Sequence, residues 1–359
     1  MLNTKKIILH TEGGLFMEKV RIKDLTYDEL TEYLLSIGLP KYRARQIYEW
    51  LYKGVESFEE MTNLSKELRE KLDNLCVITV PKILRKQVSS DGTIKYLFEL
   101  YDGETVESVL MEYKHGHPIC ISTQAGCNMG CKFCASTVGG KVRDLTAGEI
   151  CDQVIFASKD SGYDITNIVL MGIGEPLDNY DNVTKFIRNI NHHAGMNIGA
   201  RHISLSTCGL AHKIYTLADE GLPVTLSVSL HAPNDALRSS LMPVNKKYNI
   251  EKLFEACNYY IKKTNRRVTF EYTLIDGVND SVEIAKQLLK LTKGMLCHIN
   301  LIPVNSVEST NYRKSNADRI VAFRSVLEQN GVTTTVRREL GSDIDASCGQ
   351  LRRRHKEEK

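Results

Sequence analysis

The sequence lacks the features that mark several special classes of protein. No apolar run is long enough to span a bilayer, and no stretch has the hydrophobic region of a secretory signal. Internal repeats and low-complexity tracts are also missing, and the formal net charge is only +3. We therefore expect a cytoplasmic protein without a membrane partner. A charge this small allows a polyanionic partner but does not require one.

The composition is that of an ordinary globular chain. Its 359 residues can bury one large core with a smaller unit attached, and 42% of them are hydrophobic. Ten cysteines stand out against this background. In a chain without an export signal they favour metal binding or catalysis over a disulfide framework.

Three helices are predicted near the N-terminus. Regular patterning begins only around Met17, so residues 1–17 are expected to be a dispensable extension. The capping box Thr26-x-x-Glu29 starts a helix over 27–37, and further apolar periodicity predicts helices over 41–53 and 65–75. Together they indicate a small helical domain over residues 18–80.

Basic and aromatic side chains interleave on the second of these helices. Such a mixture suits a phosphate backbone with stacked bases, which predicts an RNA-binding domain. The alternative is that the inner aromatic residues belong to the core and the basic ones form a solvated face. The side chains concerned are Lys41, Tyr42, Arg43, Arg45, Tyr48 and Trp50.

The pattern changes twice after the helical domain. Asp91-Gly92 and Asp102-Gly103 separate alternating segments, which predicts a three-stranded β-meander within residues 81–114. From 115 to 345, short apolar strands alternate with helical stretches, as in an α/β parallel sheet covered by helices. Six such units are too few for a full eight-stranded barrel, so we expect a partial (β/α)6 barrel. Its strands are predicted at 119–123, 167–171, 203–207, 225–230, 268–274 and 299–304, with a further strand at 333–337.

The most informative motif is a CxxxCxxC formed by Cys127, Cys131 and Cys134. Three thiolates on one tight loop can bind three irons of a [4Fe-4S] cluster and leave the fourth iron open to a small molecule. This loop is typical of enzymes that cleave S-adenosylmethionine (SAM) reductively to produce a carbon radical. The alternative is a structural zinc site, although no fourth ligand is well placed.

Polar residues follow the predicted parallel strands, where barrel-like sheets gather their chemistry. Glycines in the segment 172–176 would let the backbone approach a ligand, and Glu175 could accept from the amino group of SAM. For each residue alone, the alternative is a polar group that merely satisfies a strand end. The candidates are Gly174, Glu175, Ser206, Ser229, Leu230, His231 and Asn305.

Three further residues are candidates for catalysis. Cys348 lies among Gly, Asp, Ser and Gln, a composition typical of an exposed loop and suited to a reactive thiol. Cys120 shares a strand face with Ser122 and could meet Cys348 if that face lines the barrel. Glu107 alternates with Val109 and Met111, and desolvation there would suit a carboxyl that transfers protons. The alternative is an edge-strand glutamate that reaches solvent. The other cysteines, including Cys208, are interpreted as packing residues.

Taken together, the cysteine loop, the segment GIGEPL at 172–177 and the segment DIDASCGQL at 343–351 resemble the RlmN-type radical-SAM RNA methyltransferases. The similarity covers about residues 18–352. It implies methylation of adenosine carbon 2 in 23S rRNA and beside the anticodon of tRNAs, with an electron donor such as flavodoxin or ferredoxin and a monomeric enzyme. The segment 346–359 would then hold the reactive cysteine and a basic tail.

The resemblance also assigns roles. Cys127, Cys131 and Cys134 would hold the cluster, and the strand-end residues named above would contact SAM. Cys348 would take a methyl group from one SAM, and a radical made from a second SAM would activate that group for addition to carbon 2. Glu107 would accept the ring proton, and Cys120 would release the product through a transient disulfide.

Two other functions are also compatible with the sequence. Cfr-type relatives methylate carbon 8 of the same rRNA adenosine and confer antibiotic resistance; they tend to have alanine where this chain has Pro176. The second rival is a non-catalytic RNA-binding protein with a structural zinc or iron–sulfur site. It would leave Cys348 and Glu107 without a purpose.

Overall fold

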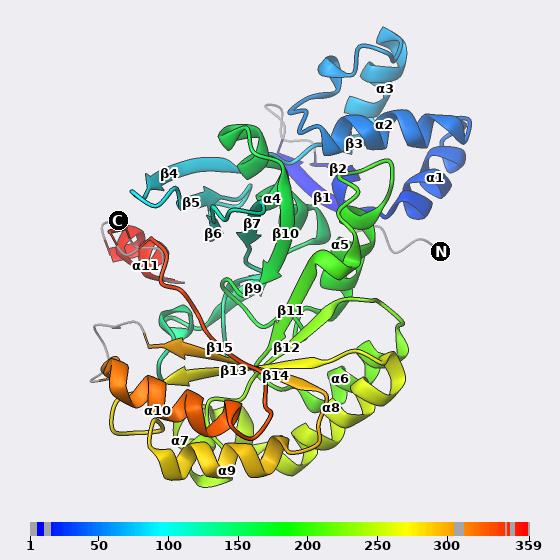
Figure 1. The fold of residues 1–359 in the computed structure, drawn as a ribbon. Coiled ribbons are helices and arrows are strands. Elements are labelled where there is room, and N and C mark those ends of the chain that lie inside the picture. Colours follow the sequence, from blue (N-terminus) through cyan, green and yellow to red (C-terminus); the bar gives the residue numbers. More distant parts are fainter. Residues whose placement is uncertain (1–5, 11–15, 305–311, 342, 345–348, 358–359) are drawn as a thin grey trace.

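The computed structural model describes residues 6–10, 16–304, 312–341, 343–344 and 349–357. Its centre is a ten-stranded sheet with the order β15-β14-β13-β12-β11-β10-β7-β6-β5-β4 (Figure 1). In the described part of the chain, no helix is long and apolar enough to cross a membrane.

Seven strands of this sheet are parallel and form the predicted partial barrel. Each pairs in parallel with its neighbour, which requires helical crossovers outside the sheet. The strand β13 is buried along its whole length, as expected for a strand covered on both faces. The seven are β7 (His117–Cys120), β10 (Ile165–Leu170), β11 (Ile203–Thr207), β12 (Thr225–Ser229), β13 (Val268–Leu274), β14 (Cys297–Pro303) and β15 (Thr334–Val336).

Helices cover the outer side of the curved parallel sheet (Figure 1). Several begin with a side-chain cap; for example, Thr146 and Glu149 form a capping box at the first of them. The covering helices are α4 (Ala147–Ser161), α5 (Tyr180–Asn191), α6 (Ala211–Asp219), α7 (Asp235–Leu241), α8 (Ile250–Thr264), α9 (Val282–Thr292) and α10 (Ala317–Glu328). The predicted fold class is therefore confirmed.

The predicted meander consists of β4 (Lys82–Val88), β5 (Ile94–Glu99) and β6 (Thr105–Leu110), all antiparallel. Gly92 and Gly103 occupy its turns with φ of +84° and +82°, a conformation that favours glycine. β6 also pairs antiparallel with β7. The predicted meander is thus a continuation of the barrel sheet itself.

The helical domain contains α1 (Tyr27–Ser36), α2 (Tyr42–Tyr52) and α3 (Lys66–Leu75), close to the predicted spans. A small sheet of β1 (Lys6–His10), β2 (Phe16–Arg21) and β3 (Cys76–Val77) adjoins it. One strand of this sheet therefore lies in the segment 1–17. That this segment is dispensable stays a prediction.

Buried polar contacts attach the helical domain to the barrel. Lys23 forms an ion pair with Asp152 of α4, and both side chains are at most 3% exposed. The backbone N–H of Gly148 also donates to Asp24 Oδ1 at 3.0 Å. A buried pair of this kind has one good geometry, so it fixes how the domain sits on α4.

On α2, the inner aromatic side chains are part of the core, and the outer basic and aromatic side chains are exposed. Tyr48 is only 1% exposed and belongs to the core, whereas Tyr42 is 59% exposed. The Arg43 guanidinium lies over the Tyr42 ring, 4.9 Å from its centroid. The outer residues Lys41 and Arg45 are also exposed. Contact of this outer part with RNA stays a prediction.

Candidate active site

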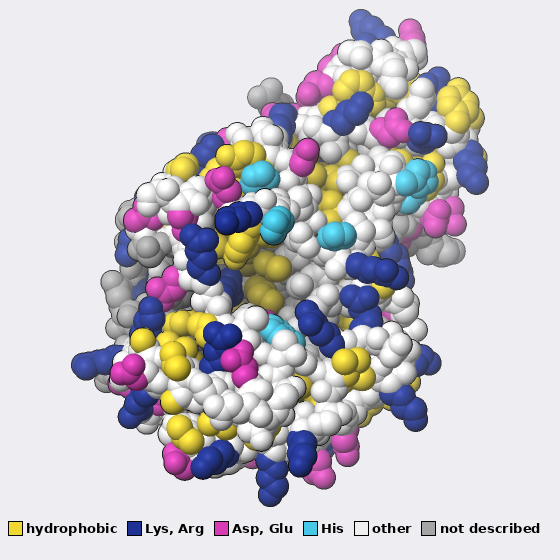
Figure 2. Space-filling view, in the orientation of Figure 1, with side chains coloured by type: hydrophobic (Ala, Val, Ile, Leu, Met, Phe, Trp, Pro, Cys, Tyr) yellow, Lys and Arg dark blue, Asp and Glu magenta, His cyan; other side chains and the backbone are white. Residues whose placement is uncertain are grey.

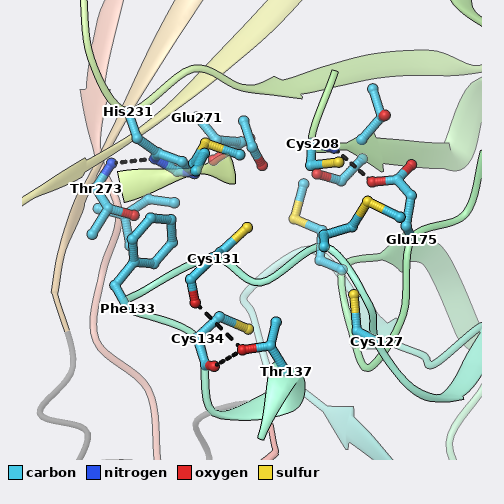
Figure 3. Close-up of a pocket in the computed structure, with 18 of the residues that line it drawn as sticks. Cys127, Cys131, Phe133, Cys134, Thr137, Glu175, Cys208, His231, Glu271 and Thr273 are labelled. Carbon is cyan, nitrogen blue, oxygen red and sulfur yellow. Dashed lines mark hydrogen bonds between the residues drawn. The ribbon is translucent and has the colours of Figure 1, made fainter. Parts of the chain in front are cut away.

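The cysteine loop lies between β8 (Gln124–Gly126) and the short 3-10 helix η3 (Ala135–Thr137). β8 pairs with β9 (Lys141–Asp144), and a Cβ on Gly126 would lie 1.9 Å from the Gly140 carbonyl oxygen. Glycine is therefore required immediately before the first cysteine. This pairing closes the loop and turns its three thiols toward one cavity of about 260 Å³ (Figure 3).

The three thiols fit a multi-iron group better than a single ion. Cys127, Cys131 and Cys134 all line the cavity. Yet within the described part of the chain no three Cys, His, Asp or Glu side chains are grouped closely enough to hold one metal ion. A cluster needs only one thiolate at each of three irons, whereas structural zinc needs four ligands around one point. Burial raises the pKa of the Cys127 thiol to about 12, and bound metal would supply the charge that favours a thiolate.

Gly174 and Glu175 form a second wall of the cavity. Gly174 has a φ of +114°, and a Cβ there would lie 2.8 Å from the backbone nitrogen of Gln124. The Glu175 carboxylate accepts from the backbone N–H groups of Leu177 at 3.0 Å and Cys208 at 2.7 Å. Burial raises the pKa of Glu175, and these amides oppose that shift. The carboxylate is fixed at the cavity, as its predicted role requires.

His231 lines the cavity at the end of β12, in a left-handed backbone conformation with φ of 56°. Its Nδ1 accepts from the backbone N–H of Thr273 at 2.8 Å. Burial, with a smaller contribution from Arg238, lowers the His231 pKa to about 3. The ring is therefore neutral, and its Nε2 carries the proton and can donate to a ligand.

The other predicted SAM contacts have different outcomes. Ser206 and Ser229 line the cavity, at the ends of β11 and β12. Leu230 is fully buried among core side chains and is not part of the cavity wall. Asn305 lies outside the described residues, although Val304 just before it lines the cavity.

Sequence reasoning missed four residues at this site. Cys208, interpreted as a packing residue, lines the cavity and supplies the amide that holds Glu175. Glu271 and Arg337 also line it, and Glu271 accepts from Asn300 Nδ2 at 2.8 Å. A glutamate inside the apolar strand β13 was a signal that could have been read. Arg238 on α7 gave no such signal.

Arg238 ties two strand ends together. Its side chain is fully buried and donates to the backbone carbonyls of Cys208 at 2.8 Å and Ser229 at 3.1 Å. It also donates to the Leu230 carbonyl at 3.2 Å. Because β11 and β12 both end at the cavity, these bonds set the positions of the residues that line it.

Glu107 lies on a different side of the site and is only 3% exposed. Since β6 runs between β5 and β7, the alternative of an edge-strand glutamate that reaches solvent is wrong. Lys95 Nζ lies 2.9 Å from Glu107 Oε2. The backbone N–H groups of Gly349 and Arg352 donate to the carboxylate at 2.7 and 2.6 Å. These contacts fix the position of the carboxylate between β5 and the start of α11 (Gln350–Glu357).

The chain around Cys348 meets the other candidates. Cys348 itself lies outside the described residues. Its neighbour Gly349 has a φ of +81°, and a Cβ there would lie 2.8 Å from the Ser136 backbone nitrogen. Gly349 thus packs directly against η3, which follows Cys134. Cys120 is buried beside Val109 and Met111, against which Leu340 also packs.

Comparison with known proteins agrees with this geometry. The family described as Radical SAM superfamily matches residues 121–288, and the Ribosomal RNA large subunit methyltransferase N-terminal domain matches residues 20–78. A Thermoanaerobacter sp. (strain X514) protein named "Probable dual-specificity RNA methyltransferase RlmN" is 54% identical over 94% of this chain and 99% of its own length. A Clostridium novyi protein of the same name is 54% identical over 93% of this chain and 98% of its own.

A solved structure has the same fold. The radical SAM methyltransferase from Sphaerobacter thermophilus superposes with a TM-score of 0.88 at 46% identity, covering 92% of this chain and 98% of that one. Of the two matched family segments, 121–288 includes the cysteine loop and 20–78 includes the three helices of the helical domain. The chain belongs to the RlmN family of radical-SAM dual-specificity RNA methyltransferases.

Proposed function

We propose that this protein methylates carbon 2 of an adenosine in 23S rRNA and of the adenosine beside the anticodon in tRNAs, using two SAM molecules per turnover. The observation that carries the proposal is the position of Gly349. It lies between the Glu107 carboxylate and the helix η3 that follows the cysteine loop. Gly349 directly follows Cys348 in the sequence, which supports a role for that cysteine in the chemistry proposed here.

The described residues indicate where the cofactors would bind. Cys127, Cys131 and Cys134 would hold a [4Fe-4S] cluster, and the cavity beside them would hold SAM. Together the bound cluster and SAM would supply a carbon radical. Glu175, Ser206, Ser229 and the Nε2–H of His231 give this cavity donors and acceptors for the amine, carboxylate and ribose of SAM. Asn305 and the main chain of Leu230 are proposed as further contacts.

Three side chains would carry the chemistry on the base. The Cys348 thiolate would displace the methyl group from one SAM. The radical supplied by a second SAM would remove a hydrogen atom from that S-methyl group, and the resulting methylene radical would add to adenine carbon 2. Glu107 would accept the ring proton. Cys120 would then attack the Cys348 sulfur and break the carbon–sulfur bond. The released methylene would take up a proton to become the methyl group, one electron would pass back to the bound cluster, and a disulfide would remain.

The Glu107 contacts leave room for this role. A carboxylate offers about four acceptor positions. Among the described residues, Lys95 and Gly349 contact Oε2 and Arg352 contacts Oε1, which accounts for three of these positions. A fourth position, on Oε1, would accept the ring proton.

The RNA would reach the cavity from the open face of the molecule. Figure 2 shows a hollow in this face with hydrophobic side chains inside and lysine and arginine side chains around its rim. A basic rim attracts phosphates, while an unstacked base can enter an apolar interior. From the family resemblance we also propose a cytoplasmic monomer that receives electrons from flavodoxin or ferredoxin.

Nucleoside mass spectrometry tests the proposal. The protein is reconstituted without oxygen and supplied with SAM, a reductant and unmodified rRNA and tRNA. The expected product is 2-methyladenosine, and the RNA that carries it identifies the substrate. The 8-methyl product would assign the chain to the carbon-8 activity instead. Zinc without sulfide in the purified protein, and no methylated product, would leave only an RNA-binding protein.

A further inference from the structure

The chain that leads to Cys348 is bonded to the turn between β4 and β5. Asp91 Oδ2 in this turn accepts from the backbone N–H of Gly341 at 2.9 Å. In the opposite direction, Asp343 accepts from the Ser89 hydroxyl and from the backbone N–H of Ser90, the latter at 2.9 Å. Each segment thus donates to the other, although the two lie about 250 positions apart in the sequence. We call this arrangement, formed by Ser89–Asp91 and Gly341–Asp343, the latch.

The latch has the chemistry of a specific contact. Both of its acceptors are carboxylates, which form stronger hydrogen bonds than neutral groups. The bond from Gly341 lowers the pKa of Asp91, and the bond from Ser89 lowers that of Asp343. Both groups are therefore charged at neutral pH. Asp91 also accepts from the Thr93 backbone N–H at 3.0 Å, which holds the turn in shape.

The chain that follows Cys348 is held by the next strands of the same meander. Glu107 of β6 accepts from Gly349 and Arg352, and Lys95 of β5 supports Glu107. The Arg352 side chain adds a bond to Glu104 Oε2 at 2.9 Å. The basic residue Arg352, expected in a tail, is thus a buried anchor at the start of α11 (Gln350–Glu357).

We propose that the β4–β6 meander is a frame that holds the chain on both sides of Cys348, with Asp91 and Asp343 as positioning residues for the transfer of carbon to RNA. The inference rests on the proposed function, because it concerns the same cysteine. Leu340, next to the latch, packs in the cluster of Cys120, Val109 and Met111. The latch therefore also holds the entering chain beside the thiol that would resolve the adduct.

If the frame did not hold Cys348 in place, cleavage of SAM would be uncoupled from methylation of the RNA. Cleavage of SAM in the cavity needs the cluster and the strand-end residues, not the latch. A methylated Cys348 that is out of place would intercept fewer radicals, so more 5′-deoxyadenosine would form for each methylated adenosine. A residue with only a general structural role would lower both products together and leave their ratio unchanged.

The test measures this ratio in reconstituted holoenzyme with rRNA as substrate. Asp343 is exposed, so Asp343→Ala should fold normally, and it removes both latch bonds of that carboxylate. We expect the ratio to rise about three- to tenfold, the size expected from the net contribution of one typical hydrogen bond at an exposed site. Asp343→Asn should restore part of the coupling, and Asp91→Asn should raise the ratio from the other side of the latch.

The matched control is Asp318→Ala, at an exposed aspartate in the first turn of α10. Its ratio should equal that of the unmodified protein. An unchanged ratio in Asp343→Ala and in Asp91→Asn, alongside normal methylation, would overturn the inference and leave the proposed function intact. Failure of the unmodified protein to methylate adenosine would overturn the proposed function, and the inference with it.

Discussion

The two ends of the central sheet contribute to the site in different ways. The seven parallel strands place their carboxyl ends around one cavity, so residues from β10, β11 and β12 meet there. The three antiparallel strands of the meander contribute Glu107 and hold the chain around Cys348 through bonds across the sequence. The parallel part thus provides a cofactor cavity, while the antiparallel part provides a support for the reactive chain.

The parallel strands and the meander also differ in how their buried charged side chains are paired. In the parallel part, Arg238 donates to backbone carbonyls and to the Asn245 side chain, and the ring of His231 is neutral. In the meander, Lys95 and Glu107 form a buried ion pair. A charged pair is costly to break and fixes one arrangement, which suits a support better than a ligand cavity.

The largest effect should come from the parallel part. Cys131→Ser replaces a predicted cluster ligand with a poor one for iron. We expect iron and sulfide content to fall to background and RNA methylation to be lost, as measured by metal analysis and nucleoside mass spectrometry. Cys297→Ser, at a half-buried cysteine outside the cavity, is the control. A normal cluster in Cys131→Ser would contradict the ligand assignment.

The next largest effect is expected in the meander, as a loss of unfolding free energy. Lys95→Met leaves the Glu107 carboxylate buried without its cation, and breaking such a pair typically costs about 3–5 kcal/mol. Urea unfolding of the apo-protein should show this loss. Lys82→Met, at an exposed lysine of β4, should change stability very little. Equal stability of the two variants would mean that the ion pair does not support the meander.

Arg238→Met should be somewhat milder, because it leaves carbonyls without donors but strands no charge. We expect a loss of about 3 kcal/mol in unfolding free energy and weaker SAM binding, since two strand ends lose their common anchor. Arg324→Met, at an exposed i,i+4 pair on α10, is the control. Full stability with unchanged SAM affinity would remove Arg238 from the account of the cavity.

Much of this comparison could be predicted from the sequence, and part could not. Periodicity and capping located the helices and parallel strands, and the strand-end rule then located Glu175, Ser206 and Ser229. The same rule did not show that the Leu230 side chain turns into the core, so only its main chain stays a predicted contact. Arg238 was missed because most of its acceptors are backbone carbonyls, which leave no mark in a sequence.

The support in the meander was harder to foresee. The alternation around Glu107 correctly indicated an unusual carboxylate, yet its partners Gly349 and Arg352 are more than 240 residues away. Local patterns carry no information on such pairs. Asp91-Gly92 indicated only a turn, although the same aspartate also holds Gly341. A residue that satisfies a local rule can therefore hide a second, long-range role.

A smaller effect is expected in the parallel part, where the free energy of unfolding should depend on pH through His231. The folded pKa of His231 is about 3, below its unfolded value near 6.5, so stability is lost as pH falls from 6.5 toward 3. Between pH 7 and 5 the loss should be roughly 2 kcal/mol. His231→Gln should remove this loss in urea unfolding of the apo-protein.

Comparison with the variant isolates His231 from other groups. The pKa of Asp152 is raised to about 6, above its unfolded value, so that group has the opposite effect and stabilises the fold as pH falls below 6. It is present in both proteins and cancels in the difference. The same pH dependence with and without His231 would show that its ring is not held neutral.

The most direct test requires the cofactor cavity of the parallel strands and the chain held by the meander to act together. Cys120→Ala is supplied with SAM, reductant and substrate RNA, and the products are separated under denaturing conditions. We expect a covalent protein–RNA species, linked through Cys348 to a substrate adenosine, because the thiol that would release it is missing. Normal turnover of Cys120→Ala with no such species would show that Cys120 does not release the product.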